Sequence, residues 1–314
     1  MSYEPLNVYL CCMSAISVII PVYNAEDTIA ACVNSVCQQS LKDIEIIIVD
    51  DGSADRSGAQ CDELALKDER ITVIHQVNEG RTAARWKGVQ CARSEWLTFV
   101  DSDDTLPEDS LHHLLQQATD DVDIVLGNGY TLTEEGETGR VRIPMEDFRH
   151  MAVRGDGTIG VPWGSLYRRS VLTYYMFDLP REIMNGEDYL FWLRLVFSTE
   201  KDVAVVRHKV YEKGEEHTSN CFVWTAGYAQ QLQALRRGSI PEGYDDRFLR
   251  DELTDRIANL FDIAVWSPRR EWAHSDYVKD IVTDMKSIGM QWTWKQRLFL
   301  NIPSLHVRKM VARL

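Results

Sequence analysis

The sequence contains no long apolar run. A helix that crosses a membrane needs about 18 or more consecutive apolar residues, and no stretch of the 314 residues meets that length. The opening segment, MSYEPLNVYLCCM, has an acidic residue and no basic one ahead of a short apolar stretch, unlike a secretory signal. We therefore expect neither a membrane-spanning helix nor a secretory leader.

Paired cysteines are also missing. The chain has seven cysteines, an odd number, and no two of them form a C-x-x-C motif. This pattern argues against a disulfide framework and against a zinc site. We interpret most of these side chains as small apolar core residues in a reducing, cytoplasmic environment.

Positive charge is scarce. With 34 Lys and Arg against 48 Asp and Glu, the formal net charge is −14. A nucleic-acid-binding protein needs clustered cations to pair with phosphates, so no nucleic-acid partner is expected. The charge is uneven, however, because residues 286–314 contain six Lys or Arg and no Asp or Glu.

Apolar runs alternate with amphipathic stretches in the first third of the chain. This alternation is typical of βαβ units and a largely parallel sheet, and hence of an α/β fold. A helical pattern is expected over 82–92 and another from Pro107 to about Ala118, with Thr105 as its cap. The expected strands are 16–21, 44–50, 71–75, 96–101 and 123–128.

The rest of the chain has a different pattern. Residues 130–160 are polar and Gly-rich, which favours a loop or hairpin over a helix. From Trp224 onward the pattern is mainly helical. We place a boundary near residue 215, which divides a catalytic domain at 14–215 from a mainly helical region at 216–314.

A polar cluster follows each of the first four expected strands. In open α/β sheets the carboxyl ends of the strands line the ligand crevice. The cluster DSDD puts Asp101 and Asp103 two residues apart, a spacing that suits a divalent cation shared with phosphate oxygens. The alternative is an acidic turn that caps the next helix.

Two further clusters contain groups that suit a nucleoside. In VDDGSAD, Asp50 or Asp51 could accept a hydrogen bond from a base or a ribose hydroxyl, although an ordinary Asp-Gly turn has the same sequence. In PVYN, Tyr23 offers a flat ring for stacking, although a lone Tyr after a strand is usually structural.

The segments NEGRTAAR and NGEDYLFWLRL each begin a predicted helix. The first puts Arg81 and Arg85 one turn apart, where they could meet a pyrophosphate or simply face solvent. The second has Asn185 as a cap and Glu187 and Asp188 in its first turn. One of these carboxylates could act as a general base, or both could serve only the helix dipole.

The C-terminal segment 292–314 combines aromatic, apolar and basic residues. Such a tail suits the interface of an anionic bilayer. The competing interpretation is a C-terminal helix docked on the domain.

Taken as an ordered set over about residues 15–200, PVYN, VDDGS, NEGRTAAR, DSDD and GED resemble the family 2 glycosyltransferases of the GT-A fold. These are the bacterial enzymes that build capsule, exopolysaccharide and other envelope glycans. The resemblance implies a Rossmann-like nucleotide-binding half and an acceptor-binding half around one central mixed, mostly parallel sheet, followed here by the helical region.

The resemblance also implies a role for each matching residue. Asp101 and Asp103 would hold Mn2+ or Mg2+, with Asp103 the direct ligand, while Asp188 would be the catalytic base with Glu187 as its neighbour. The nucleotide-sugar site would comprise Pro21, Tyr23, Asn24, Asp50, Asp51, Asn78, Arg85, Asp101 and Ser102.

The sequence departs from the family pattern in three places. Trp86 stands where relatives usually have Asn, and Ser165 stands where many have Lys. Residues 210–220 read VYEKGEEHTSN, where relatives often have an aromatic-Arg pair and a downstream Ser. These departures leave the acceptor open.

The resemblance implies an inverting transferase of the hexosyltransferase type. It would move a sugar from a UDP-sugar to a hydroxyl of a glycan or lipid-linked acceptor, in the cytoplasm or peripherally on the inner face of the plasma membrane. The alternative is a haloacid-dehalogenase-like phosphatase with Asp101 as nucleophile, because DSDDT also fits D-x-D-x-T. A catalytically silent sugar-nucleotide binder is a third hypothesis.

Overall fold

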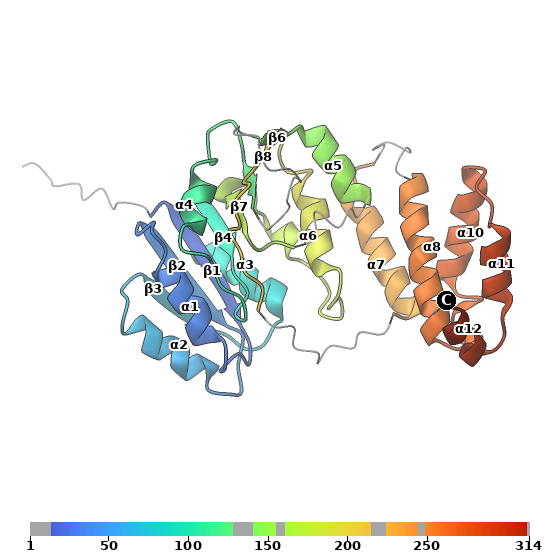
Figure 1. Cartoon of the computed structure of the whole chain (residues 1–314), viewed down its shortest axis with the longest axis horizontal. Coiled ribbons are helices and arrows are strands. Elements are labelled where there is room, and N and C mark those ends of the chain that lie inside the picture. The colour runs from blue at the N-terminus through green and yellow to red at the C-terminus, as the bar shows by residue number, and fades with distance from the viewer. Residues whose placement is uncertain are drawn as a thin grey trace, which may run out of the picture.

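A mixed sheet forms the centre of the N-terminal part of the chain, and helices make up the C-terminal part (Figure 1). The computed structural model describes residues 14–127, 141–154, 161–214, 224–242, 244 and 249–312.

Within the described residues the sheet has eight strands in the order β3-β2-β1-β4-β7-β5-β8-β6. Strands β3, β2, β1 and β4 are parallel, and so are β5 and β8, whereas β7 and β6 run antiparallel to their neighbours. The predicted mixed, mostly parallel sheet is therefore confirmed. The strands are β1 (Ile16–Val22), β2 (Ile44–Asp50), β3 (Ile71–His75), β4 (Trp96–Phe99), β5 (Ile124–Leu126), β6 (Val141–Ile143), β7 (Ser165–Arg168) and β8 (Val203–Val205).

Helices cover both faces of this sheet. Alternate residues of β1 point to opposite faces, so Ile20 joins a core under α1 and α2 while Ile19 joins a second core under α3 and α6. Strands buried on both faces need apolar residues at nearly every position, which explains the unbroken run of isoleucines in β2. The helices of this part are α1 (Ile29–Cys37), α2 (Ser57–Ala65), α3 (Arg81–Cys91), α4 (Ser110–Leu115), α5 (Met145–Arg154) and α6 (Glu187–Leu195).

The C-terminal helices have a hydrophobic core of their own. Leu260, Ile263, Trp272 and Ile281 lie at its centre. Contacts of α6 with α7 and of α5 with α8 join this helical region to the sheet region. Its helices are α7 (Ala226–Ser239), α8 (Leu249–Trp266), α9 (Arg269–Trp272), α10 (Asp276–Ser287), α11 (Trp294–Asn301) and α12 (Leu305–Val311). No helix in the described part of the chain is both long and apolar enough to span a bilayer.

Two predicted helix starts were wrong. Helix α4 begins at Ser110 rather than Pro107, and Thr105 is not its cap, because the backbone of Thr105 pairs in both directions with Glu212. Helix α6 begins after Gly186 rather than Asn185, whose backbone N–H instead donates to the Tyr228 hydroxyl (2.9 Å). In both cases a long-range partner bonds the backbone of the residue that was expected to cap the helix.

The prediction of a loop or hairpin over 130–160 was wrong for residues 145–154, which form α5. Phe148 and Ala152, one turn apart, are buried, and the Phe148 ring packs edge-on against Trp192 at 5.7 Å. The Asp202 carboxylate accepts a hydrogen bond from Met145 N (3.1 Å) and so satisfies the first turn of the helix. Tertiary burial therefore outweighed a polar local composition. The sheet strand β6 also lies in this region, and residues 155–160 lie outside the described part.

The C-terminal tail docks on the helical region. Phe299 of α11 packs on Phe261 of α8 with 5.2 Å between ring centroids, and Arg308 of α12 is fully buried against α8. The expected domain boundary at residue 215 borders residues that the structure does not describe, so it stays a prediction.

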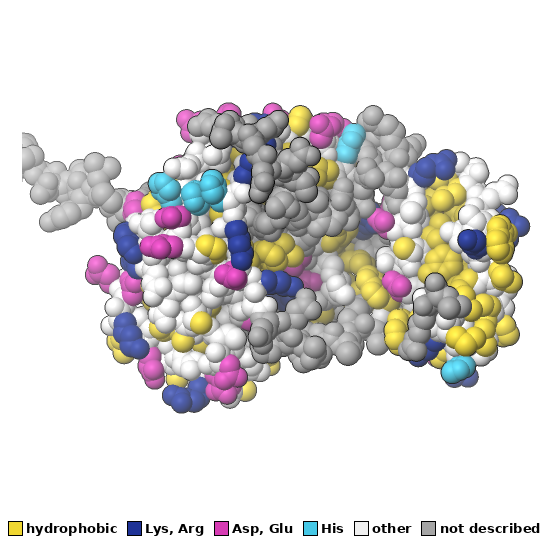
Figure 2. All heavy atoms as spheres, in the orientation of Figure 1, with side chains coloured by type: hydrophobic (Ala, Val, Ile, Leu, Met, Phe, Trp, Pro, Cys, Tyr) yellow, Lys and Arg dark blue, Asp and Glu magenta, His cyan; other side chains and the backbone are white. Residues whose placement is uncertain are grey.

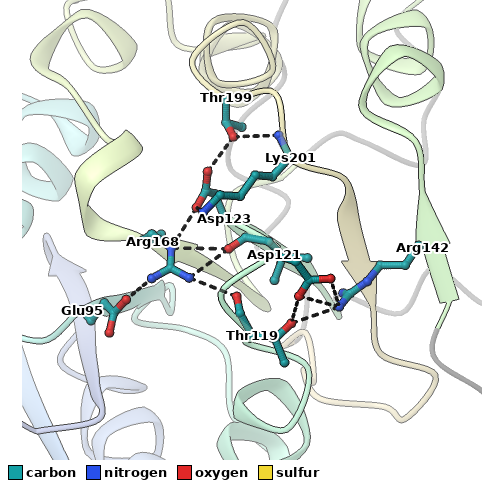
Figure 3. A network of polar contacts seen from close by, with 9 residues as sticks. Glu95, Thr119, Asp121, Asp123, Arg142, Arg168, Thr199 and Lys201 are labelled. Carbon is teal, nitrogen blue, oxygen red and sulfur yellow. Dashed lines mark hydrogen bonds and ion pairs between the residues drawn. The ribbon is translucent and has the colours of Figure 1, made fainter.

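A polar network joins β5, β7 and the segment before β8 at the sheet end away from the cavity described below (Figure 3). At its centre the buried Asp123 accepts hydrogen bonds from Arg168 Nε (2.8 Å), Lys201 Nζ (3.0 Å) and Thr199 Oγ1 (2.6 Å). Each partner satisfies a lone pair that burial would otherwise leave unpaired. We interpret this network as structural, because it fixes three chain segments to one carboxylate.

Candidate active site

A cavity of about 800 Å3 opens at the carboxyl ends of β1, β2 and β4. The N-terminus of α3 forms one side of it, and Pro180, Arg181, Ile183 and Met184 form another. This is the edge at which the sequence predicted a ligand crevice. The predicted site residues that line it are Pro21, Tyr23, Asn24, Asp51, Asn78, Asp101, Ser102, Asp103 and Glu187.

The loop that follows β4 presents Asp101 and Asp103 to the cavity. Its shape is set from behind by Asp104, whose buried carboxylate accepts hydrogen bonds from the Tyr211 hydroxyl and from Gly214 N, both at 2.7 Å. The same hydroxyl accepts from Asp101 N (3.0 Å). A Cβ on Gly214 would lie 2.1 Å from the Asp103 carbonyl oxygen, so only glycine allows this approach.

Sequence reasoning missed Asp104 and Tyr211. Burial raises the pKa of both groups, which keeps the phenol protonated as a donor to Asp104. The Tyr211 ring stacks on Trp163 with 4.2 Å between centroids. The rigid support of the acidic loop therefore comes from residues more than a hundred positions away in the chain.

Asp50 and Asp51 have different roles, although they are adjacent. Asp51 Oδ1 accepts from Gln76 Nε2 and Glu79 N and its Oδ2 accepts from Gly80 N, all at 2.8 Å, so it organises the turn that begins α3 and also lines the cavity. Asp50 is not part of the cavity wall. Its carboxylate instead accepts from Ser53 N (3.1 Å) and contacts His75 Nδ1 (2.9 Å).

The loop after β1 lines the cavity. Tyr23 is 53% exposed there, with its ring free for stacking. Asn24 adopts a positive φ of 48° and its Oδ1 accepts from Ala54 N (2.8 Å). Since Asn tolerates the left-handed region better than most residues, this position explains the Asn of PVYN. Gly52 in the facing turn also needs positive φ (71°).

Arg85 joins the acidic loop to α6. Its guanidinium, only 3% exposed, donates from Nη1 to Asp188 Oδ1 (2.7 Å) and from Nη2 to Asp101 Oδ1 (2.9 Å). Arg81, one turn earlier on α3, pairs with Glu187 (3.1 Å). Arg85 and Asp188 thus lie directly behind residues of the cavity wall. The interpretation of these arginines as solvated surface residues is wrong for Arg85.

The segment 180–184, which we call the segment over the cavity, contains residues that the sequence did not single out. Arg181 donates from Nη2 to Asn78 Oδ1 (2.5 Å), and Met184 is 61% exposed. Both line the cavity. Their only sequence signal is the position just before GED, at the entry to the predicted helix.

Two of the departures from the family pattern, Trp86 and Ser165, have separate explanations, and residues 215–220 of the third lie outside the described part. Trp86 packs on Tyr174 and Phe177, with centroid distances of 5.8 and 5.6 Å, so it serves the core beneath α3. Ser165 is fully buried in β7 and is not part of the cavity wall.

Comparison with known proteins identifies the family. The sequence profile described as glycosyl transferase family 2 matches residues 17–175, from β1 through the acidic loop and β7. The chain belongs to glycosyl transferase family 2. Because DSDDT lies within this match, the phosphatase alternative is dropped.

Relatives with curated descriptions extend the likeness. The chain is 35% identical to the putative glycosyltransferase EpsH of Bacillus subtilis, over 63% of this chain and 60% of that protein. It is 40% identical to the glycosyltransferase GlyG of Streptococcus pneumoniae, over 42% of this chain and 45% of that protein. The chain thus spans about half to three fifths of the length of these two relatives.

Solved structures show the same GT-A fold. Residues 1–349 of TarS from S. aureus, in complex with UDP, superpose with a TM-score of 0.58 at 18% identity, covering 88% of this chain and 93% of that one. The mannosyltransferase PcManGT from Pyrobaculum calidifontis, in complex with GDP-Man and Mn2+, gives a TM-score of 0.54 at 16% identity, covering 95% and 86%.

The electrostatics of this family 2 site centre on the two acidic residues of α6. Burial, together with the charge of the neighbouring Asp188, raises the pKa of Glu187 from its ordinary value of 4.5 to about 7, although Arg81 opposes the change. Burial also raises the pKa of Asp188, against the opposing charge of Arg85. A folded state that holds a carboxyl proton more tightly than the unfolded chain loses stability as the pH rises from the unfolded pKa to the folded pKa.

We expect the free energy of unfolding to fall between about pH 4.5 and pH 7 through Glu187, because the folded pKa is the higher one. Glu187→Gln should remove this component, which is on the order of 2–3 kcal/mol. Urea unfolding at a series of pH values measures it, with the exposed Glu63→Gln as the matched control. Identical pH profiles for the wild type and Glu187→Gln would contradict the prediction.

Proposed function

We propose that this protein is an inverting, metal-dependent glycosyltransferase of the hexosyltransferase type. It would transfer a sugar from a nucleotide-diphosphate sugar, most simply a UDP-sugar, to a hydroxyl of a glycan or lipid-linked acceptor in envelope polysaccharide synthesis. One observation carries the proposal: Arg85 bonds both Asp101 of the acidic loop and Asp188 of α6. This contact supports the proposal because it links the residue expected to deprotonate the acceptor, directly behind the cavity wall, to the acidic loop expected to hold the leaving group.

The relatives support a nucleotide-sugar donor. TarS is described in complexes with UDP and with UDP-GlcNAc, and PcManGT in a complex with GDP-Man and Mn2+. EpsH and GlyG are both described as glycosyltransferases. The cavity, at about 800 Å3, is of the size that nucleotide-sugar ligands need.

The donor set fits Mn2+ or Mg2+. These ions take one or two carboxylates and complete their shells with phosphate oxygens and water. Asp103 is exposed at the cavity, and Asp101 beside it is fixed by Arg85. A bound ion would neutralise the negative charge that develops on the diphosphate of the departing nucleotide. Among the described residues no cluster of three or more metal-ligating side chains exists, which suits a shell shared with a substrate.

The chain's own residues would position and deprotonate the substrates. A nucleoside would stack on the Tyr23 ring and would donate a hydrogen bond from its base or ribose to the Asp51 carboxylate, since both side chains line the cavity. Arg85 holds Asp188 by Oδ1, so Oδ2 is the oxygen that would receive the acceptor proton. Because the acceptor oxygen would attack the anomeric carbon opposite the pyrophosphate, the configuration there would invert.

The test is thermal unfolding with a panel of nucleotides and nucleotide sugars, each with and without Mn2+. A ligand that binds only the folded state stabilises it by about 2.7 kcal/mol when the ligand concentration is a hundred times Kd. This stabilisation raises the melting temperature. We expect UDP-sugars to stabilise the protein only with the metal, and turnover to release the nucleotide. Stabilisation without turnover on any acceptor would favour the silent binder, and no stabilisation by any ligand would contradict the proposal.

Asp103→Asn should abolish the Mn2+-dependent part of that stabilisation. Loss of an outer-shell partner alone typically lowers metal affinity by about 10–100-fold, so loss of a direct ligand should lower it at least as much. Isothermal titration of the protein with Mn2+ and UDP measures the change. Glu108→Gln is the control, since Glu108 is exposed just beyond the same loop and is not part of the cavity wall. Unchanged affinity in Asp103→Asn would remove Asp103 as a ligand.

A further inference from the structure

The last two helices turn apolar side chains toward solvent. On α11, Trp294 and Leu298 lie one turn apart and are 71% and 63% exposed. On α12, Met310 is 56% exposed, and Val307 and Val311 lie on the same face because residues three and four apart are neighbours on a helix. A helix that only covers a soluble domain normally turns such residues inward.

The inward face of α12 is also unusual, because its buried residue is a cation instead of an apolar side chain. Arg308 is completely buried, and its guanidinium donates to the carbonyl oxygens of Ala264 (2.6 Å), Ser267 (3.0 Å) and Ile302 (2.5 Å). A buried charge is tolerated only when its donors are satisfied in this way. The hydrogen bonds of Arg308 therefore hold α12 with its apolar face outward.

Cations accompany these exposed side chains. Lys309 lies over the exposed Trp266 ring at 4.6 Å, and Lys295 lies over the Trp294 ring at 5.8 Å. Figure 2 shows hydrophobic and Lys or Arg side chains side by side on the C-terminal helices. We use the name tail surface for the exposed apolar residues of these helices together, which are Trp266, Trp294, Leu298, Val307, Met310 and Val311.

We propose that the tail surface binds the interface of an anionic bilayer. Trp and Lys have an apolar body and a polar or charged end, so they suit a layer that is apolar on one side and charged on the other. The segment 286–314 has no Asp or Glu in a chain whose net charge is −14. Arg308 is buried, but Lys286, Lys295 and Arg297 are exposed and Lys309 is half-buried, so positive charge is concentrated where it would meet acidic headgroups. A symmetric contact between two copies would instead oppose these cations to one another.

The proposal is tested by co-sedimentation of the full chain with vesicles. Vesicles of phosphatidylglycerol and phosphatidylcholine should bind the protein, vesicles of phosphatidylcholine alone should bind far less, and added salt should weaken the binding. No nucleotide sugar is needed, so the outcome is independent of the proposed transfer reaction. A wild-type chain that binds neither kind of vesicle would overturn the proposal.

Variants identify the surface. Lys295→Glu combined with Lys309→Glu should reduce partitioning onto the acidic vesicles by about tenfold or more, and Trp294→Ala combined with Leu298→Ala should also reduce it. The matched control is Leu66→Ala with Lys67→Glu, an exposed Leu-Lys pair at the end of α2, which should bind as the wild type does. The melting temperature of each variant checks that it folds.

Two results would overturn the assignment. One is equal vesicle binding by the folded tail-surface variants and the control. The other is a dimer in size-exclusion chromatography that Trp294→Ala with Leu298→Ala dissociates, without vesicle binding by the wild type, because the occupant would then be a second copy of the chain.

Discussion

Replacing Asp188 by asparagine should lower the rate of sugar transfer by about 10²–10⁴-fold and leave nucleotide-sugar affinity nearly unchanged. Asparagine keeps the oxygen that accepts from Arg85 Nη1, so the bond that positions α6 against α3 survives. What disappears is the ability to take a proton. The effect should therefore fall on kcat rather than on donor binding.

The measurement is the rate of UDP release with an acceptor, alongside the thermal stabilisation by donor and Mn2+. Glu182→Gln is the control, because Glu182 is exposed in the same segment over the cavity but is not part of its wall. Glu187→Gln separates the two neighbouring carboxylates. If that variant loses transfer and Asp188→Asn keeps full activity, the base is Glu187.

Arg85→Met should destabilise the fold by about 3–5 kcal/mol, the usual cost of removing one partner from a buried ion pair. Arg85 is 3% exposed and neutralises Asp101 and Asp188 together. Without it the carboxylates of Asp101, in the cavity wall, and Asp188, behind that wall, lose their shared cation, and Glu187 adds a third negative charge nearby. Lysine would not restore the site, because it lacks the planar fork that bonds two carboxylates at once.

Urea unfolding near neutral pH tests this prediction. Arg93→Met is the matched control: the Arg93 side chain is 71% exposed, and its partner Glu45 keeps hydrogen bonds from Ser17 and Ser94. The control should cost no more than about 1 kcal/mol. If Arg85→Met unfolds at the same urea concentration as Arg93→Met, the bridge between the acidic loop and α6 contributes nothing measurable.

Local sequence patterns determined the part of the fold that places the site. The apolar runs of β1, β2 and β4 and the polar cluster after each were evident from the sequence, because strands buried on both faces need apolar residues throughout. Parallel strands end at one edge, so clusters far apart in sequence were expected to converge. The helix in 145–154 was missed because its stability depends on burial against α6, where Phe148 packs on Trp192, and the polar local sequence did not indicate that burial.

Only the tertiary structure decided which neighbouring side chains reach the site. Asp50 and Asp51 look equivalent in sequence, yet one contacts His75 and the other lines the cavity, since successive residues of an extended chain point to opposite sides. The sequence left Arg85 either at a pyrophosphate or in solvent, and only the fold brought Asp188 of α6 to it. Arg308 looked like a surface cation, yet α8 buries it. Spacing along the chain determines which residues share an element, whereas the partner of a charged group depends on segments that only folding brings together.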